Sequence, residues 1–330
     1  MKKVLLFLLI TCCSGVVLAN FNDGEKAFKE QRWVVAYNEF NPIAEEGDIR
    51  AQYYMGYLTL NGLGTIRNEK KAIDYFNKAA KQDSDMAQAM LGYLYAEGIG
   101  VKKNKKKSLE FYEKAAAKGN GDALLNLGVM YYTGDGVSKD VNRAIEHLSK
   151  VSTVDKPIAA KYLGDIYLND TTVQDPQKAF NYYVIAARSG DIASYHILGY
   201  MFQNGLHVKQ NINDAIKYYT YAASQRYIPS QYALGAIYAN GEGITRDVYK
   251  AHAYLTMAAA AGMPEAEKAK KQLEEDMSLS ERDKASHAMI TVQQEDLNAV
   301  AVPIDNNTKI KETTTNTTKK QTTIRRRRRR

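Results

Sequence analysis

The stretch from Met90 to Ala116, MLGYLYAEGIGVKKNKKKSLEFYEKAA, decides the fold. Its Gly-Ile-Gly, set between two apolar runs, fits either a loop that cradles a phosphate group or a connector between two helices. Catalytic loops are usually single, whereas structural connectors recur. Because related stretches recur along the whole chain, the sequence favours the helix connector.

A Leu-Gly or Met-Gly pair marks each copy of this stretch. The glycines of successive pairs lie 36, 36, 36, 35 and 36 residues apart. A fixed period between about 20 and 50 residues is typical of a solenoid, in which each repeat is one supersecondary unit. Six copies carry the pair, with the glycines at Gly56, Gly92, Gly128, Gly164, Gly199 and Gly235.

Each repeat contains two segments with helical periodicity. In the first, a small residue, a leucine and an aromatic residue recur four positions apart and fall on one stripe of a helix. The second, exemplified by SLEFYEKAA, also has apolar residues at helical spacing. In the connectors, such as EGIGVKKN, glycine permits a positive φ and Asn or Asp can cap the next helix. The fourth connector, NDTTVQDP, has no glycine and is expected to turn differently.

The pattern A-x3-LG-x2-Y-x2-G-x-G-V, followed by KA-x2-Y-x-KAA, resembles the Sel-1-like repeat family, relatives of the tetratricopeptide repeat. The resemblance covers about residues 47–262. It implies an all-α fold, an α-solenoid of six antiparallel helix pairs stacked into a right-handed superhelix. It also implies a protein-binding scaffold, and it specifies neither a partner nor a pathway.

Both flanks of the repeats predict capping helices, because end repeats would otherwise expose their core to water. Residues 20–46 are expected to form an atypical leading pair of helices, with Trp33 packing inward. Residues 263–302 are expected to form a charged closing pair. Beyond them, residues 303–330 are rich in Thr, Asn and Lys with few apolar residues, which predicts a disordered tail.

Residues 1–19 have the features of a secretory signal peptide: a charged start, a short apolar run and a small-residue cleavage site before Asn20. Both cysteines, Cys12 and Cys13, lie in this segment, so the mature chain would hold no disulfide. The expected location is the periplasm or the outside of a bacterial cell. An uncleaved membrane anchor facing the periplasm is the alternative, although the run is short for a span of about 20 residues. Lipidation of either cysteine fits less well, because a small residue does not precede it.

The net charge of +8 is unevenly distributed. Residues 303–330 hold ten basic and two acidic residues, whereas the part between this tail and the signal holds 33 basic and 35 acidic residues. Only the tail is therefore expected to seek anionic lipid, lipopolysaccharide or nucleic acid, and no specific nucleic acid is expected as a partner. An engineered extension or a low-complexity accident would also explain the terminal block of Arg325, Arg326, Arg327, Arg328, Arg329 and Arg330.

The sequence nominates no catalytic, cofactor-binding or metal-binding residue. The five histidines lie in separate segments without a zinc-binding spacing, and His147 occupies an aromatic position of a second helix, where packing is expected. Neither a phosphate-binding loop nor a nucleophile elbow is present. Some cysteine-rich secreted relatives in the family have been linked to antibiotic hydrolysis, but this chain lacks those cysteines. We expect a protein that is not an enzyme.

The face of the first helices that points away from their core stripe is the predicted binding surface. In tetratricopeptide-like stacks this side lines a concave groove, and tyrosines with scattered polar groups suit peptide recognition. The alternative is that these tyrosines pack against neighbouring first helices. The expected role is a scaffold or adaptor in envelope maintenance or host interaction, or alternatively a surface anchor that holds on through its tail. The candidate residues are Tyr53, Tyr57, Tyr93, Lys161, Asp165, His196, Tyr200 and Tyr232.

Overall fold

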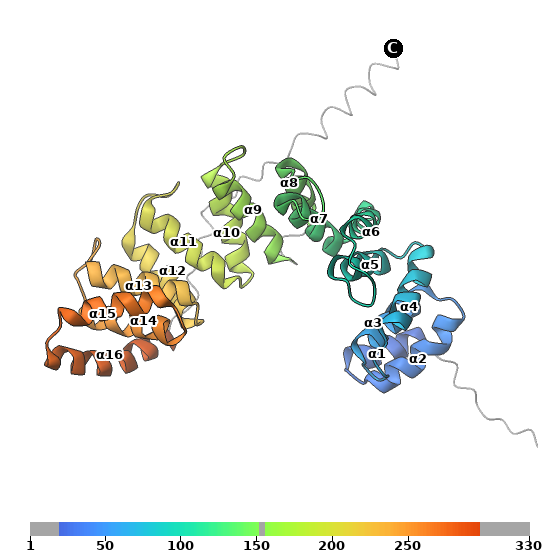
Figure 1. Cartoon of the computed structure of the whole chain (residues 1–330), viewed down its shortest axis with the longest axis horizontal. Helices are drawn as coiled ribbons and strands as arrows, with labels where there is room; N and C mark the ends of the chain where they lie inside the picture. The colour runs from blue at the N-terminus through green and yellow to red at the C-terminus, as the bar shows by residue number, and fades with distance from the viewer. Residues whose placement is uncertain (1–19, 152–155, 298–330) are drawn as a thin grey trace, which may run out of the picture. The chain divides into compact units, whose positions relative to one another are not determined.

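The computed structural model describes residues 20–151 and 156–297. Every element of regular secondary structure in these ranges is a helix. The prediction of an all-α fold is therefore confirmed. The chain divides into two compact units, the first ending at Val151 (Figure 1). The predicted signal peptide (1–19) and the predicted basic tail (303–330), with its six arginines, lie outside the described residues.

Each unit contains eight described helices of mostly thirteen residues. Those of the first unit are α1 (Phe21–Lys29), α2 (Trp33–Glu45), α3 (Ile49–Asn61), α4 (Glu69–Lys81), α5 (Asp85–Glu97), α6 (Lys105–Ala117), α7 (Gly121–Thr133) and α8 (Val141–Lys150). Those of the second are α9 (Pro157–Asn169), α10 (Pro176–Arg188), α11 (Ile192–Asn204), α12 (Ile212–Ser224), α13 (Ile228–Asn240), α14 (Val248–Ala260), α15 (Pro264–Glu275) and α16 (Leu279–Leu297).

Six helix pairs correspond to the six sequence repeats. We call the first helix of each pair the A helix (α3, α5, α7, α9, α11 and α13) and the second the B helix (α4, α6, α8, α10, α12 and α14). Every A helix packs most extensively on its own B helix, and within each unit every B helix packs on the next A helix. This nearest-neighbour packing is the defining property of a solenoid.

The connectors end and begin helices as the sequence predicts. Five A helices end at a glycine in the left-handed conformation, the usual C-terminal cap: Gly62, Gly98, Gly134, Gly205 and Gly241. The B helices begin at a capping side chain that accepts a backbone N–H bond: Asn68, Asn104, Asp140, Asp175, Asn211 and Asp247. The glycine-free fourth connector differs, because Asp170 ends α9 in an extended conformation with φ −87°.

The recurring glycine of each A helix allows a large side chain of the B helix to lie against the backbone. A methyl group on Gly92 would lie 2.6 Å from the Tyr112 ring, and one on Gly128 would lie 2.5 Å from Leu148 Cγ. Helices α1 and α2 repeat this arrangement, with Gly24 facing Phe40. The leading pair is therefore a shortened copy of the repeat. The other four pairs are Gly56–Phe76, Gly164–Tyr183, Gly199–Tyr219 and Gly235–Leu255.

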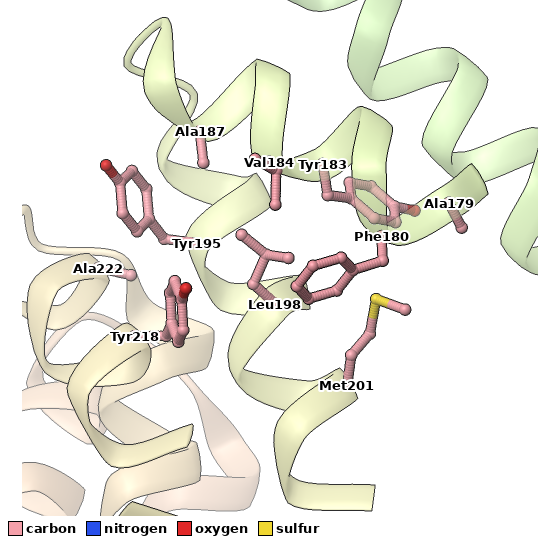
Figure 2. Packing of buried hydrophobic residues seen from close by; sticks show 10 residues of the cluster. All are labelled: Ala179, Phe180, Tyr183, Val184, Ala187, Tyr195, Leu198, Met201, Tyr218 and Ala222. Carbon is pink, nitrogen blue, oxygen red and sulfur yellow. The ribbon is translucent and has the colours of Figure 1, made fainter. Parts of the chain in front are cut away.

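Aromatic side chains fill the core between the helices. In the second unit, Phe180 and Tyr183 of α10 gather with Leu198 of α11 and Tyr218 of α12 (Figure 2). Five repeats also stack one ring of the A helix on one of the B helix: Tyr95–Phe111, Tyr131–His147, Tyr167–Tyr182, Phe202–Tyr218 and Tyr238–Tyr254. The predicted packing role of His147 is confirmed, since its ring lies 5.6 Å from that of Tyr131.

The two ends are covered by helices outside the six repeats. Trp33 of α2 is partly buried and packs edge-to-face on Phe28 of α1, with ring centroids 5.3 Å apart. At the other end, α15 and α16 both pack on α14. Ser278 and Glu281 form reciprocal side-chain-to-backbone bonds at the start of α16, which is the capping-box arrangement.

Candidate partner-binding surface

The candidate surface is the side of the A helices that faces away from their own core stripe, which we call the A-helix face. It exposes two tyrosines at equivalent positions, Tyr93 on α5 in the first unit and Tyr200 on α11 in the second. Their exposed fractions are 46% and 47%, the largest of any aromatic side chain in the described ranges. Such rings offer apolar area and a hydroxyl group to a partner.

Tyrosines of the B helices also reach the A-helix face. The ring of Tyr183 lies against Gly164, and its hydroxyl donates to Asp165 Oδ1 at 2.7 Å. In the next repeat, the ring of Tyr219 lies against Gly199, and its hydroxyl donates to Gln203 Oε1 at 2.9 Å. The absence of a side chain on each glycine therefore lets a buried ring deliver its hydroxyl to residues of the A-helix face.

Lys161 and Asp165 form a partly buried ion pair on α9. Lys161 Nζ lies 2.8 Å from Asp165 Oδ2, and the two side chains are only 25% and 20% exposed. Burial alone lowers the pKa of Lys161, but the hydrogen bond and charge of Asp165 outweigh burial, so the pKa is raised. With Tyr183 as a second donor, Asp165 has both oxygens engaged. The pair presents a fixed positive and a fixed negative charge.

His196 of α11 contacts the following repeat. Its Nδ1 lies 3.0 Å from the hydroxyl of Ser230, a fully buried residue of α13. Its ring also lies 5.4 Å from that of Tyr227. Burial raises the pKa of Tyr227, the charge of Lys161 lowers it and the charge of Asp165 raises it. Burial lowers the pKa of His196 to about 4, so the ring is neutral at neutral pH.

The remaining candidate of the second unit, Tyr232, is half-buried on α13. It packs against the apolar cluster shared by α13, α14, α15 and α16. The structure therefore gathers Lys161, Asp165 and His196 around Tyr227, with Tyr200 exposed on the same helix as His196.

The candidates of the first unit differ in exposure. Tyr53 is half-buried, and its ring contacts Tyr54 and Phe76 with centroids 5.7 and 5.8 Å apart. Burial, reinforced by neighbouring tyrosines and carboxylates, raises its pKa to about 12. Tyr57 packs on Phe28 of α1, a neighbouring helix, at 5.6 Å. Packing between neighbouring helices, the alternative to binding, thus describes Tyr57, whereas Tyr93 is exposed.

Carboxylates surround the exposed tyrosine of the first unit. Burial raises the pKa of Tyr112, the B-helix tyrosine beneath Gly92, and the charges of Glu97 and Asp122 raise it further. Tyr93 also raises the pKa of the Tyr112 hydroxyl, so Tyr93, Glu97 and Asp122 all lie near that hydroxyl. The A-helix face of the first unit therefore places Glu97 and Asp122 near Tyr93, whereas that of the second contains the lysine–aspartate pair.

Sequence reasoning did not nominate Tyr112, Tyr183, Tyr219 or Tyr227 as residues of the face. The first three lie on B helices, whose apolar side is expected to be buried. The detectable signal was the spacing of about twenty residues between each A-helix glycine and a tyrosine rather than a phenylalanine or leucine.

The described ranges offer neither a metal site nor a membrane span. Residues 20–151 and 156–297 contain no group of three or more His, Cys, Asp or Glu side chains placed to hold a metal ion. None of the helices in the described ranges has the length and apolar character that crossing a bilayer requires.

The packing of helix pairs and the recurring glycines define an α-solenoid of helix-pair repeats. The model of the Sel1 repeat matches residues 49–84, 85–120, 121–151, 157–191, 192–227 and 228–263. The chain belongs to the Sel1 repeat family, as the sequence pattern predicted. Proteins of this family are in general scaffolds for protein–protein interaction.

Solved structures similar to this chain include the following two. One is a protective antigen present in uropathogenic Escherichia coli strains, 25% identical, with a TM-score of 0.72 over 84% of this chain. The chain spans 61% of the length of that antigen. The other is a Sel1 repeat protein from Oxalobacter formigenes, 27% identical, with a TM-score of 0.64 over 73% of this chain and all of the other.

Proposed function

We propose that this protein is a non-catalytic scaffold that binds an extended peptide segment of a partner protein on its A-helix face. The observation that carries the proposal is the exposure of Tyr93 and Tyr200 at equivalent repeat positions, each above a buried B-helix tyrosine. Their rings stand on rigid helices, so binding would order few further bonds in the scaffold. Rigid aromatic anchors of this kind commonly dominate binding energy.

The polar groups around the tyrosines would select the peptide. In the second unit, the fixed charges of Lys161 and Asp165 would orient a peptide that carries both charges or dipolar backbone groups. In the first unit, Glu97 and Asp122 would favour a positively charged side chain beside Tyr93. Electrostatic complementarity mainly sets specificity and the rate of association. The two faces are therefore expected to prefer different peptide segments.

The proposed setting is the periplasm or the cell exterior, with cleavage before Asn20. Support comes from the signal-like sequence of residues 1–19 and from the similarity to an antigen of a pathogenic bacterium. A role in envelope maintenance or host interaction would follow from this setting. The test of location is N-terminal sequencing of the protein recovered from fractionated cells, which should begin at Asn20.

The binding proposal is tested with peptides selected from a random displayed library on the full chain. A selected peptide should bind at least about tenfold more weakly to the Tyr93→Ala or the Tyr200→Ala variant, as expected for an anchor residue. The matched control is Lys217→Ala on the exposed side of α12, which should leave affinity within about twofold. Failure to select any peptide, or equal binding to all three variants, would contradict the proposal.

A further inference from the structure

The outer side of the first unit carries an excess of unpaired lysines that the net charge of the chain conceals. They lie on α4, on α6 and in the connector before α6, and we call this surface the lysine face. Within the described ranges, none of them has a carboxylate at ion-pair distance: Lys70, Lys71, Lys78, Lys81, Lys102, Lys103, Lys106, Lys107 and Lys114. The exposed carboxylates of the same helix sides are Asp74, Glu110 and Glu113.

The lysines form one surface because α4 and α6 are held in register at both ends. The connector before α6 lies on the start of α4, where a methyl group on Gly100 would lie 2.7 Å from Glu69 Cβ. At the other end, Lys118 after α6 bonds to the backbone and carboxylate of Asp83 after α4. Both helices belong to the first unit (Figure 1).

Several of these exposed lysine side chains also lie near aromatic rings. The ammonium groups of Lys71 and Lys78 lie 5.7 and 5.5 Å from the centroid of Tyr75. In the next repeat, the ammonium group of Lys107 lies 5.2 Å from the centroid of Tyr95. Cation–π contacts of this kind restrict the side chain without neutralising its charge. The lysine face therefore retains its positive charge in a partly ordered array.

An exposed isoleucine stands at the edge of this array. Ile66, in the connector before α4, is 88% exposed, the most exposed large apolar side chain in the described ranges. Ile66 lies two residues before the N-cap residue of the next helix. In other connectors this position holds Lys102, Ser138, Lys209 and Thr245. The neighbouring position, which is Val or Ile in those connectors, is Thr65 here. The first connector therefore presents outward an apolar side chain that no neighbouring residue needs for packing.

We propose that the lysine face, with Ile66 at its edge, docks the protein on an anionic phospholipid surface. Lysines near such a surface contribute through charge alone and need no fixed hydrogen-bond geometry, which suits a fluid array of headgroups. An exposed apolar side chain beside them can enter the headgroup region. In the described ranges no exposed aromatic ring lies among these lysines, so the base-stacking that single-stranded nucleic acid uses is missing.

The test is co-sedimentation of the full chain with vesicles of phosphatidylcholine alone or with about one third phosphatidylglycerol. The protein should bind the anionic vesicles and not the neutral ones. It should dissociate as the salt concentration is raised, because salt screens exposed charges. Replacing Lys70, Lys71, Lys78 and Lys81 with glutamine should lower the partition coefficient at least about tenfold, given a roughly fivefold contribution per lysine at the surface. Ile66→Ser should lower it by a smaller factor.

Two matched controls separate this face from other sources of positive charge. Glutamine at Lys209, Lys217, Lys268 and Lys271 of the second unit removes the same charge and should leave partition within about twofold. Glutamine at all six positions of 325–330 tests the tail in the same way. Equal binding to neutral vesicles, equal loss in either control, or binding to a DNA duplex without binding to vesicles would each overturn the proposal.

Discussion

Replacing Gly128 with alanine reports directly on whether the recurring glycine creates the contact between the two helices of a repeat. A methyl group there would lie 2.5 Å from Leu148 Cγ and 2.7 Å from Leu148 Cδ2. Carbon atoms in contact are ordinarily about 3.5–4.0 Å apart, so the helices would have to separate by about 1 Å. Leu148 is fully buried, which leaves its side chain little room to move.

The expected magnitude follows from two opposing effects. Overpacking a core costs typically about 1–3 kcal/mol, whereas exchanging glycine for alanine inside a helix gains about 1 kcal/mol. The Gly128→Ala variant should therefore lose up to about 2 kcal/mol, and Gly128→Leu should lose more. A glycine that faced solvent would give the opposite sign, because only the gain in helix propensity would remain.

The assay is urea unfolding followed by circular dichroism, repeated in a Leu148→Ala background. That background removes the side chain that the new methyl group would strike, so Gly128→Ala should then stabilise by up to about 1 kcal/mol. Gly119→Ala is a useful comparison, because a methyl group there would meet no atom within 4 Å and only the left-handed backbone, with φ +84°, opposes it. Stabilisation by Gly128→Ala with Leu148 present would refute the packing argument.

Three further predictions concern other parts of the chain. Stability should fall as pH decreases from 6.5 towards about 4, because burial lowers the pKa of His196 and the unfolded chain then binds one more proton than the folded chain. His196→Gln should remove the part of this loss that His196 causes, at most about 3 kcal/mol, as measured by urea midpoints across that range. Tyr93→Ala and Tyr200→Ala should each change stability by less than about 0.5 kcal/mol, whereas the half-buried Tyr57→Ala should lose about 1–3 kcal/mol; equal losses in calorimetry would count against the assigned exposures. Arg226→Gly should stabilise by up to about 1 kcal/mol, because Arg226 adopts a φ of +61°, and an unchanged melting temperature would show that the strain is small.

The period of the glycines predicted the helix pairs, and the Gly and the Asn or Asp residues of the connectors predicted their caps. The sequence also predicted that the fourth connector, which lacks glycine, would turn differently, and Asp170 there adopts an extended conformation. The leading pair was recognised only as atypical. Its glycine and aromatic residue, Gly24 and Phe40, are sixteen residues apart rather than about twenty, because α1 and its connector are short. Gly24 therefore lies 32 residues before Gly56, which is shorter than the period of 35 or 36 residues.

The candidate surface was predicted only in part, because position on a helix does not determine exposure. Tyr57 and Tyr93 occupy the same repeat position, yet α1 covers the first with Phe28 and leaves the second exposed. The hydroxyl groups of Tyr183 and Tyr219 reach the A-helix face only because a glycine lies in their path. Such contacts depend on how two helices meet, which a single helical wheel does not contain.

The sequence prediction also missed the uneven charge within the body of the chain, because it counted the charges of the whole body together. Between the signal and the tail, basic and acidic residues nearly balance, which suggested a neutral body. The structure separates them, with carboxylates such as Asp122 near the A-helix face and unpaired lysines on the outer sides of α4 and α6. Residues 49–120 hold thirteen basic and seven acidic residues, and the balance over the whole body conceals this local excess.

Site-specific photo-cross-linking in the cells that produce the protein tests the central claim most directly. A photoreactive phenylalanine derivative would replace Tyr93 or Tyr200 on the A-helix face, and Lys78 or Lys217 on the outer sides of B helices as controls. If the A-helix face binds a protein segment, the first two positions should each give a discrete cross-linked protein, and the controls should not. Cross-links only from the control positions, or none from Tyr93 and Tyr200, would contradict the claim.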